Sequence, residues 1–279
     1  MDTGFTSQDA QSDFSSARRR AALAKLAGKL RGQAGDVTTL LPFEEVVDAL
    51  GRVDERYLGT ETIPLETIVG SVDRAEEFDS KFRPTTSRLR QRWMRINKAQ
   101  REGKGMPPID VYRIGGLHFV SDGHHRVSVA RHRDLEVVEA RVTEVKTRVK
   151  PDEELSVSDL GAKDHERLFL ERVPLAPEQR DRIKPTKPEP GYAQLAECVE
   201  AWGFRLIQGT GEPLDRAEVA ASWFSDEFVP VCEALREAGL ATKETDVDAY
   251  LRLANQRYLL LRTHEWDEDV IERLQAAVD

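Results

Sequence analysis

The feature that most constrains this chain is a glycine turn between an apolar, β-prone segment and a segment with helical character. Residues 121–131 read Ser-Asp-Gly-His-His-Arg-Val-Ser-Val-Ala-Arg, and Leu117, Phe119 and Val120 precede them. The first backbone N–H groups of a helix have no partner within the helix, and the helix dipole is positive at that end. A strand, a tight glycine turn and a helix start therefore predict an anion site at this point.

The side chains around the turn suit the same chemistry. Arg126 has a planar fork that fits two phosphate oxygens, and Gly123 allows close approach of the backbone. His124 and His125 can donate to phosphate or exchange protons near neutral pH. They point about 100° apart on a helix and are not expected to bind one metal together. The alternative is that the turn is only structural, with Arg126 in a salt bridge and Asp122 capping the helix. Asp122 could equally serve as a metal ligand.

Hydrophobic periodicity predicts an N-terminal half that mixes helices and strands. A two-residue turn, Gly115-Gly116, lies between two apolar segments and favours a β-hairpin. The expected helices are residues 17–30, 42–50, 86–101 and 124–132, and the expected strands are residues 62–69, 109–114, 117–120 and 137–145.

The C-terminal half is expected to be helical. Residues 151–190 contain six prolines among charged residues, which predicts a connector. Asp215 is expected to cap one helix, and Cys198 and Cys232 are expected to be buried free thiols. The expected helices are residues 193–202, 216–228, 230–238, 246–261 and 267–277. The expected aromatic core of this bundle is Trp202, Trp223, Phe224, Phe228, Tyr250 and Tyr258.

Charge divides the chain in two. The 279 residues carry a net charge of −9, yet residues 1–150 hold 26 Lys and Arg against 22 Asp and Glu, while residues 151–279 hold 15 against 28. The densest basic run is Lys81 to Lys104, with nine cations and one acid, Glu102. It predicts a nucleic-acid face, a solvated helix face or a dock for the acidic half. No apolar run is long enough for a bilayer and no signal core is visible, so we expect a cytoplasmic protein without membrane contact.

The central block resembles a known family. Its matching segments are Ile63-Pro64-Leu65-Glu66-Thr67-Ile68, Asp73-Arg74, Phe78-Asp79, Met106-Pro107-Pro108-Ile109-Asp110-Val111-Tyr112, Phe119 to Arg126, and Ala130. Together they resemble the N-terminal domain of ParB-like proteins, in the ParB/sulfiredoxin superfamily, over about residues 61–145. The resemblance implies a nucleotide phosphate pocket at Gly123, His124, His125 and Arg126, with Arg74 as a second cation.

The resemblance implies the fold of the central block, and the sequence patterns described above imply the rest. The expected class is α+β, a small mixed-sheet domain of the ParB/sulfiredoxin type followed by an all-α helical bundle. The expected divisions are N-terminal helices over 1–60, the ParB-like domain over 61–150, the proline-rich connector over 151–190 and an acidic helical domain over 191–279. Two departures matter. The acidic second half disfavours the basic DNA-binding domain of partitioning ParB proteins. Sulfiredoxin chemistry requires a cysteine beside the turn, and neither Cys198 nor Cys232 is near it in the sequence.

Three functions are compatible with these residues. The first is a ParB-like regulatory protein that binds CTP, ATP or ADP with Mg²⁺ and contacts a protein partner or a second copy through its helices. The second is a small-molecule kinase or nucleotide hydrolase, similar to the free-serine kinases of the superfamily, with Glu76 or Glu77 as the base. The third uses Arg88, Arg92 and Arg95 to bind DNA.

Overall fold

The computed structural model describes residues 6–30, 39–239 and 244–261. The chain divides into two compact units, Met1–Lys163 and Asp164–Asp279, and each is described by itself. The first unit combines helices with a six-stranded mixed sheet, whereas the described part of the second is helical. The fold is therefore mixed α+β, as the sequence predicts.

The sheet of the first unit has the strand order β1-β3-β5-β4-β6-β2. β4 and β5 form an antiparallel hairpin in which Ile114 pairs with Leu117, which confirms the predicted turn at Gly115-Gly116. β3 runs parallel to β1 and β5, β4 runs parallel to β6, and β2 is an antiparallel edge strand beside β6. The strands are β1 (Leu41–Pro42), β2 (Arg52–Pro64), β3 (Ile68–Ser71), β4 (Ile109–Ile114), β5 (Leu117–Asp122) and β6 (Val137–Thr147).

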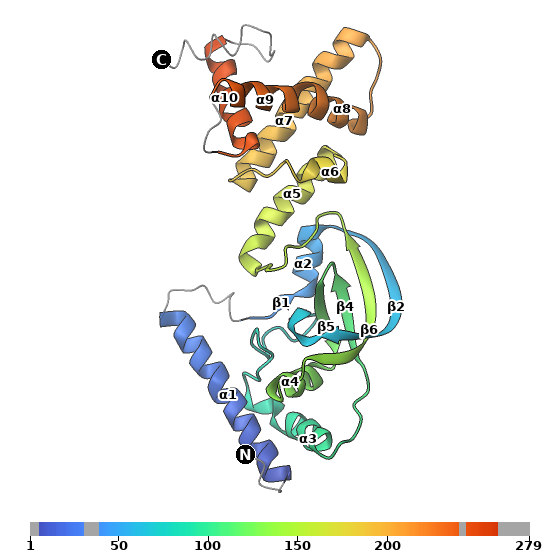
Figure 1. Cartoon of the computed structure of the whole chain (residues 1–279), viewed down its shortest axis with the longest axis vertical. Coiled ribbons are helices and arrows are strands. Elements are labelled where there is room, and N and C mark those ends of the chain that lie inside the picture. Colours follow the sequence, from blue (N-terminus) through green and yellow to red (C-terminus); the bar gives the residue numbers. More distant parts are fainter. Residues whose placement is uncertain (1–5, 31–38, 240–243, 262–279) are drawn as a thin grey trace. The chain divides into compact units, whose positions relative to one another are not determined.

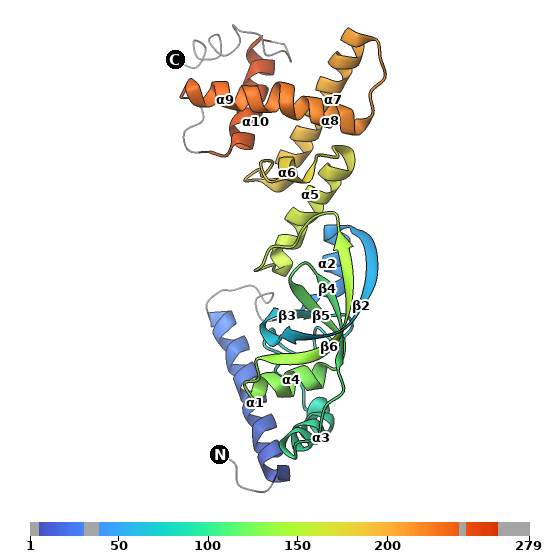
Figure 2. The same cartoon turned by 45° about the vertical axis from the view of Figure 1, so that its right-hand side comes forward.

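Helices α1 (Thr6–Leu30), α3 (Arg90–Arg101) and α4 (His124–His132) form one group beside the sheet. Figures 1 and 2 both show α3 next to α4, and α1 packs on α3. α2 (Phe43–Leu50) lies elsewhere on the sheet and ends at Gly51, whose φ of 73° is in the left-handed region. This stop agrees with the sequence, because glycine adopts that conformation without strain.

Helix α4 is buried along most of its length. Val127 and Val129 are fully buried and join a core that includes strands β3 to β6 and Trp93 of α3. Two polar contacts fix the helix within this core. The Trp93 indole N–H donates to the Ser128 hydroxyl at 2.8 Å, and Arg131 donates to backbone carbonyls of the β3 region. Since buried polar groups need partners, these bonds set the position of α4.

Three N-terminal expectations need correction. The helix expected over 17–30 begins earlier, at Thr6. The predicted strand over 62–69 is the end of β2, a 3₁₀ turn at Leu65–Thr67 and the start of β3. Residues 1–60 are also not only helical, because β2 begins at Arg52. Most of β2 is exposed, so the period-two alternation that marks a half-buried strand is absent from its sequence.

The segment 151–190 is also more structured than a connector. It contains α5 (Leu160–Arg172) and α6 (Pro177–Arg180), and the division between units falls within α5. The prolines lie outside the run that forms α5, where they do not interrupt the helical hydrogen bonds. Further along, the helices are α7 (Pro188–Thr210), α8 (Arg216–Ser222), α9 (Val229–Glu237) and α10 (Asp246–Leu261), with a π-helical turn at Trp223–Phe228.

Several C-terminal expectations are confirmed, although the helix expected over 193–202 is part of the longer helix α7, Pro188–Thr210. Asp215 caps α8 by accepting the backbone N–H groups of Ala217 and Glu218, both at 2.8 Å. The side chains of Trp223, Phe228 and Tyr250 are fully buried, whereas Trp202 and Phe224 are partly buried. Both cysteines are free thiols; Cys232 is buried and Cys198 is partly buried. The helix expected over 267–277 and the side chain of Tyr258 lie outside what the structure describes.

Across the described parts of the chain, every helix is too short or too polar to cross a bilayer.

Candidate anion-binding site at the start of helix α4

The backbone of the glycine turn has the geometry that the sequence predicts. Gly123 has a φ of 103°, and a Cβ added there would lie 2.5 Å from a side-chain carbon of Ile109. The Gly123 carbonyl accepts the N–H groups of Arg126 and Val127 at 2.7 and 3.0 Å. Within the described residues, the N–H groups of His124 and His125 donate to no acceptor. Two backbone donors at the positive end of α4 therefore have no acceptor among the described residues, as an anion site at a helix start requires.

His124 is held by the end of strand β3. Its Nε2 atom lies 2.7 Å from the hydroxyl of Ser71, which also accepts the backbone N–H of Arg74 at 2.9 Å. Phe78 stacks on the imidazole with ring centroids 6.1 Å apart. The ring is only 3% exposed, and burial lowers the pKa of His124 to about 4 although Asp73 lies 3.7 Å away. His124 is therefore a neutral, positioned side chain at pH 7.

His125 is buried beside it. The ring is 4% exposed and meets Phe78 edge to face, and its Nδ1 atom has no hydrogen-bond partner among the described residues. Burial and then the charges of Arg92 and Arg74 lower the pKa of His125 to about 4. The expectation that these two histidines exchange protons near neutral pH is therefore wrong for the unliganded fold, because desolvation penalises the imidazolium ion.

The Arg126 guanidinium is bound to other groups of the protein. Its Nη1 atom donates to the carbonyls of Pro107 and Pro108 at 2.8 and 2.7 Å, and its Nη2 atom contacts the carboxylate of Asp122. The side chain is 13% exposed. This is the salt-bridge alternative from the sequence, and it shows Asp122 paired with Arg126. Arg126 as a phosphate ligand stays a prediction, and phosphate would compete with Asp122 for its guanidinium.

Other cations face the turn. Arg74 lies in the loop after β3 and pairs with Glu77 at 3.2 Å. Arg92 and Arg74 both act on the two buried histidines, and Arg95 acts on His125 as well. Arg92 and Arg95 are exposed on α3 and, in the described part of the chain, neither forms an ion pair. Charges of both signs therefore surround the start of α4: Asp73 and Asp122 act on His124 against the cations, while Arg92 and Arg95 have no ion pair among the described residues.

The acidic candidates differ in their surroundings. The Glu77 carboxylate contacts Arg74, whereas Glu76 is exposed and the contact found for it is through its backbone carbonyl, to the hydroxyl of Thr85. Either residue as a catalytic base stays a prediction. Around Asp122, and elsewhere in the described residues, no three His, Cys, Asp or Glu side chains converge as metal ligands would. Asp122 as a metal ligand stays a prediction.

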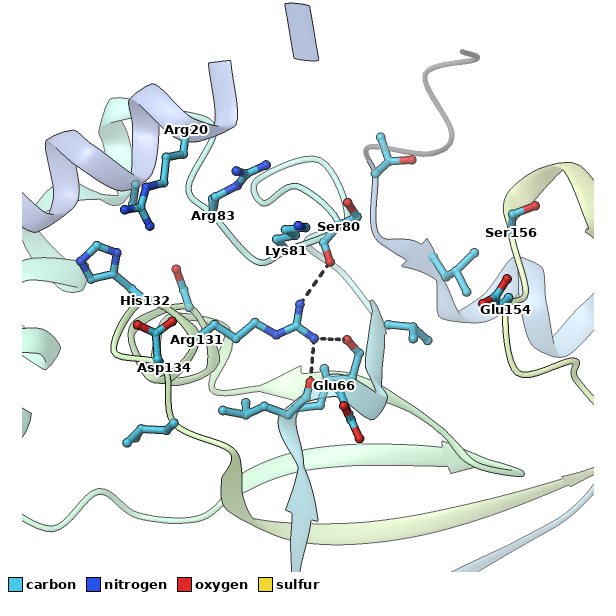
Figure 3. Close-up of a pocket in the computed structure, with 18 of the residues that line it drawn as sticks. Arg20, Glu66, Ser80, Lys81, Arg83, Arg131, His132, Asp134, Glu154 and Ser156 are labelled. Carbon is cyan, nitrogen blue, oxygen red and sulfur yellow. Dashed lines mark hydrogen bonds between the residues drawn. The ribbon is translucent and has the colours of Figure 1, made fainter. Parts of the chain in front are cut away.

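The sequence reasoning missed Ser71 and the role of Phe78, which together hold the two histidines. Ser71 ends an apolar strand, and its small hydroxyl side chain at the strand end is the sequence feature that could have indicated its role. It also missed a separate cavity of about 970 Å³ that is lined by Ser128, Arg131 and His132 at the other end of α4 (Figure 3). None of the residues predicted to bind phosphate lines this cavity.

Comparison of the chain with protein-family models, with curated proteins and with solved structures found no match.

The buried histidines predict a pH-dependent stability. The pKa values of His118, His124 and His125 fall from 6.5 to about 4 on folding, and burial is the largest cause. Between these values the unfolded chain binds more protons than the folded one, so stability falls as the pH drops through this window. At about 1.4 kcal/mol per pKa unit, each histidine accounts for a loss of at most about 3 kcal/mol in the free energy of unfolding.

Urea unfolding between about pH 7 and pH 4.5 measures this dependence. His125→Gln keeps a neutral side chain at every pH and should flatten the profile relative to wild type. A wild-type unfolding free energy that does not change over this range would contradict the neutral, buried state of the histidines.

Proposed function

We propose that the chain is a ParB-like regulatory protein that binds the phosphates of a nucleotide at the start of helix α4. The observation that carries the proposal is the pair of unsatisfied backbone N–H groups of His124 and His125, set among the cations Arg74, Arg92 and Arg95. Backbone donors at a helix N-terminus and nearby arginines are the usual means of binding phosphate. The sequence resemblance supports the same assignment.

The roles of the side chains follow from their contacts. The two backbone N–H groups would donate to phosphate oxygens. Arg92 of α3 would bind the same phosphate from the side of that helix. Arg74 would exchange its partner Glu77 for phosphate. Arg126 would hold the loop at Pro107 and Pro108 and so fix the turn. Mg²⁺ would travel with the nucleotide phosphates and neutralise part of their charge. CTP, ATP and ADP all present this phosphate chemistry.

Calorimetric titration with CTP, ATP and ADP, each with Mg²⁺, tests the proposal. Wild type should bind at least one nucleotide, and Arg92→Ala should weaken that binding about tenfold, because a contact with a charged group is removed. Arg133→Ala is the matched control, since Arg133 is an exposed arginine just past the opposite end of α4. Absence of binding to all three nucleotides, or equal binding by the Arg92 and Arg133 variants, would rule the site out.

A second candidate function, binding of DNA, is favoured by the exposed cations at the start of α3. Arg92 and Arg95 are three residues apart and share one side of α3, and Arg88 lies in the 3₁₀ turn Ser87–Leu89 that precedes the helix. No ion pair involving them is found in the described residues, so their charge is available to a polyanion. A duplex bound here would share Arg92 with the nucleotide, and the two ligands would compete.

Fluorescence anisotropy with a labelled duplex at increasing salt tests this surface. The triple variant Arg88→Glu, Arg92→Glu and Arg95→Glu should lose binding, and the wild-type affinity should fall steeply as salt rises. The control carries the same charge change at exposed cations elsewhere in the first unit: Arg56→Glu, Arg133→Glu and Lys146→Glu. Equal loss in both triple variants would indicate a net-charge effect and refute a specific face.

A further inference from the structure

The cavity of about 970 Å³ in the first unit lies apart from the glycine turn. Its lining comes from α1, β3, the loop at residues 80–83, the C-terminal end of α4 and the loop at residues 153–156. Volumes of this size suit a small organic ligand. The cavity is therefore large enough to be a second binding site on the same unit.

One wall of the cavity is rich in cations. Figure 3 shows Arg20, Lys81, Arg83 and Arg131 gathered on one side, with Glu154 and Ser156 across from them. Arg83 is neutralised by Asp79 at 2.7 Å. Arg20 and Lys81 form no ion pair within the described residues. Among the described residues, the charges of Arg20 and Lys81 are therefore not balanced by a direct ion pair, although the acid Asp134 also lines this side of the cavity.

Arg131 makes the imbalance sharper. Its guanidinium donates to the carbonyls of Leu65, Ile68 and Ser80 at 2.6, 2.7 and 3.2 Å, and it lies 5.2 Å from the centre of the Phe82 ring. These hydrogen-bond partners are neutral. Burial lowers the pKa of Arg131, because the cation is removed from water, and the nearby Asp79 opposes this effect. A partly buried cation whose hydrogen-bond acceptors are all neutral favours an anion in the adjoining space.

The rest of the lining limits what that anion can be. Leu41, Leu65 and Leu155 are buried and give the cavity apolar surface. Four exposed acids, Glu66, Asp134, Glu153 and Glu154, also line it and would repel a second anionic group on the ligand. The fitting ligand therefore has one anionic end and an apolar body.

We propose that this cavity binds a small amphipathic anion, with its carboxylate or phosphate group at Lys81, Arg20 and Arg131 and its apolar body on the leucine surface. The site is separate from the proposed nucleotide site, whose residues lie at the opposite end of α4 and do not line the cavity. A ligand here would contact both the C-terminal end of α4 and the loop at residues 80–83. This ligand would therefore be a second one, besides the nucleotide, that contacts helix α4.

Fluorescence titration of the full chain with 1-anilinonaphthalene-8-sulfonate tests the site, because this probe is an amphipathic anion. We expect saturable binding of one probe per chain, with much weaker binding of the neutral analogue N-phenyl-1-naphthylamine. The double variant Arg20→Ala and Lys81→Ala should bind the anionic probe about tenfold more weakly, since two cations are removed. Both side chains are exposed, and their loss leaves the core contacts in place.

The matched control is Arg133→Ala with Lys146→Ala, which removes two exposed cations that do not line the cavity. Octanoate and octyl phosphate then compete with the probe, and the better competitor identifies the anionic group as carboxylate or phosphate. Equal binding of the neutral analogue, equal affinity in the two double variants, or displacement by neither competitor would overturn the proposal.

Discussion

The burial of helix α4 is the constraint on which the first unit depends. Its apolar residues pack into the core between the sheet and α3, and each polar side chain that enters with them needs a partner. Ser71 accommodates His124, Ser128 meets Trp93, and Arg131 reaches three backbone carbonyls. These contacts fix the helix along its length. They also place His124 and His125 where the charge of Arg92 on α3 acts on both imidazoles.

The two ends of α4 present different chemistry because they meet different parts of one loop. The loop after β3 places Arg74 and Phe78 near the start of the helix. The same loop continues to Ser80 and Lys81, which lie at the cavity beside Arg131. A ligand at either end contacts this loop. The proposed phosphate site and the proposed amphipathic-anion site therefore share a structural element, although they share no ligating residue.

Local sequence patterns were sufficient for part of this structure. The bounds of α4 and α10, the hairpin turn and the Asp215 cap follow from glycine, capping residues and helical periodicity. β2 was missed because its exposed surface removes the alternation on which strand prediction depends. The helix α5 was missed because the prolines of the segment 151–190 indicated a connector, although none of them lies within the helix. Local signals predict elements well only where one face is buried.

The candidate site shows a different limit. The turn at Gly123 and its backbone donors were predictable, since they depend on residues adjacent in sequence. The partners of Arg126 were not, because Pro107 and Pro108 reach it through the tertiary fold. The neutral state of His124 and His125 also depends on burial by Phe78 and the core, which no local pattern specifies. The chemistry of side chains at the turn therefore required the structure.

In the proposed function, the first N–H groups of α4 bind phosphate. Because these donors belong to the backbone, side-chain substitution tests them only indirectly, whereas amide NMR observes them directly. Titration of ¹⁵N-labelled protein with nucleotide and Mg²⁺ should shift the amide resonances of His124 and His125 while that of Arg133 stays in place. Unchanged resonances for His124 and His125 at saturating nucleotide, or shifts centred on Lys81 and Arg131, would contradict the account.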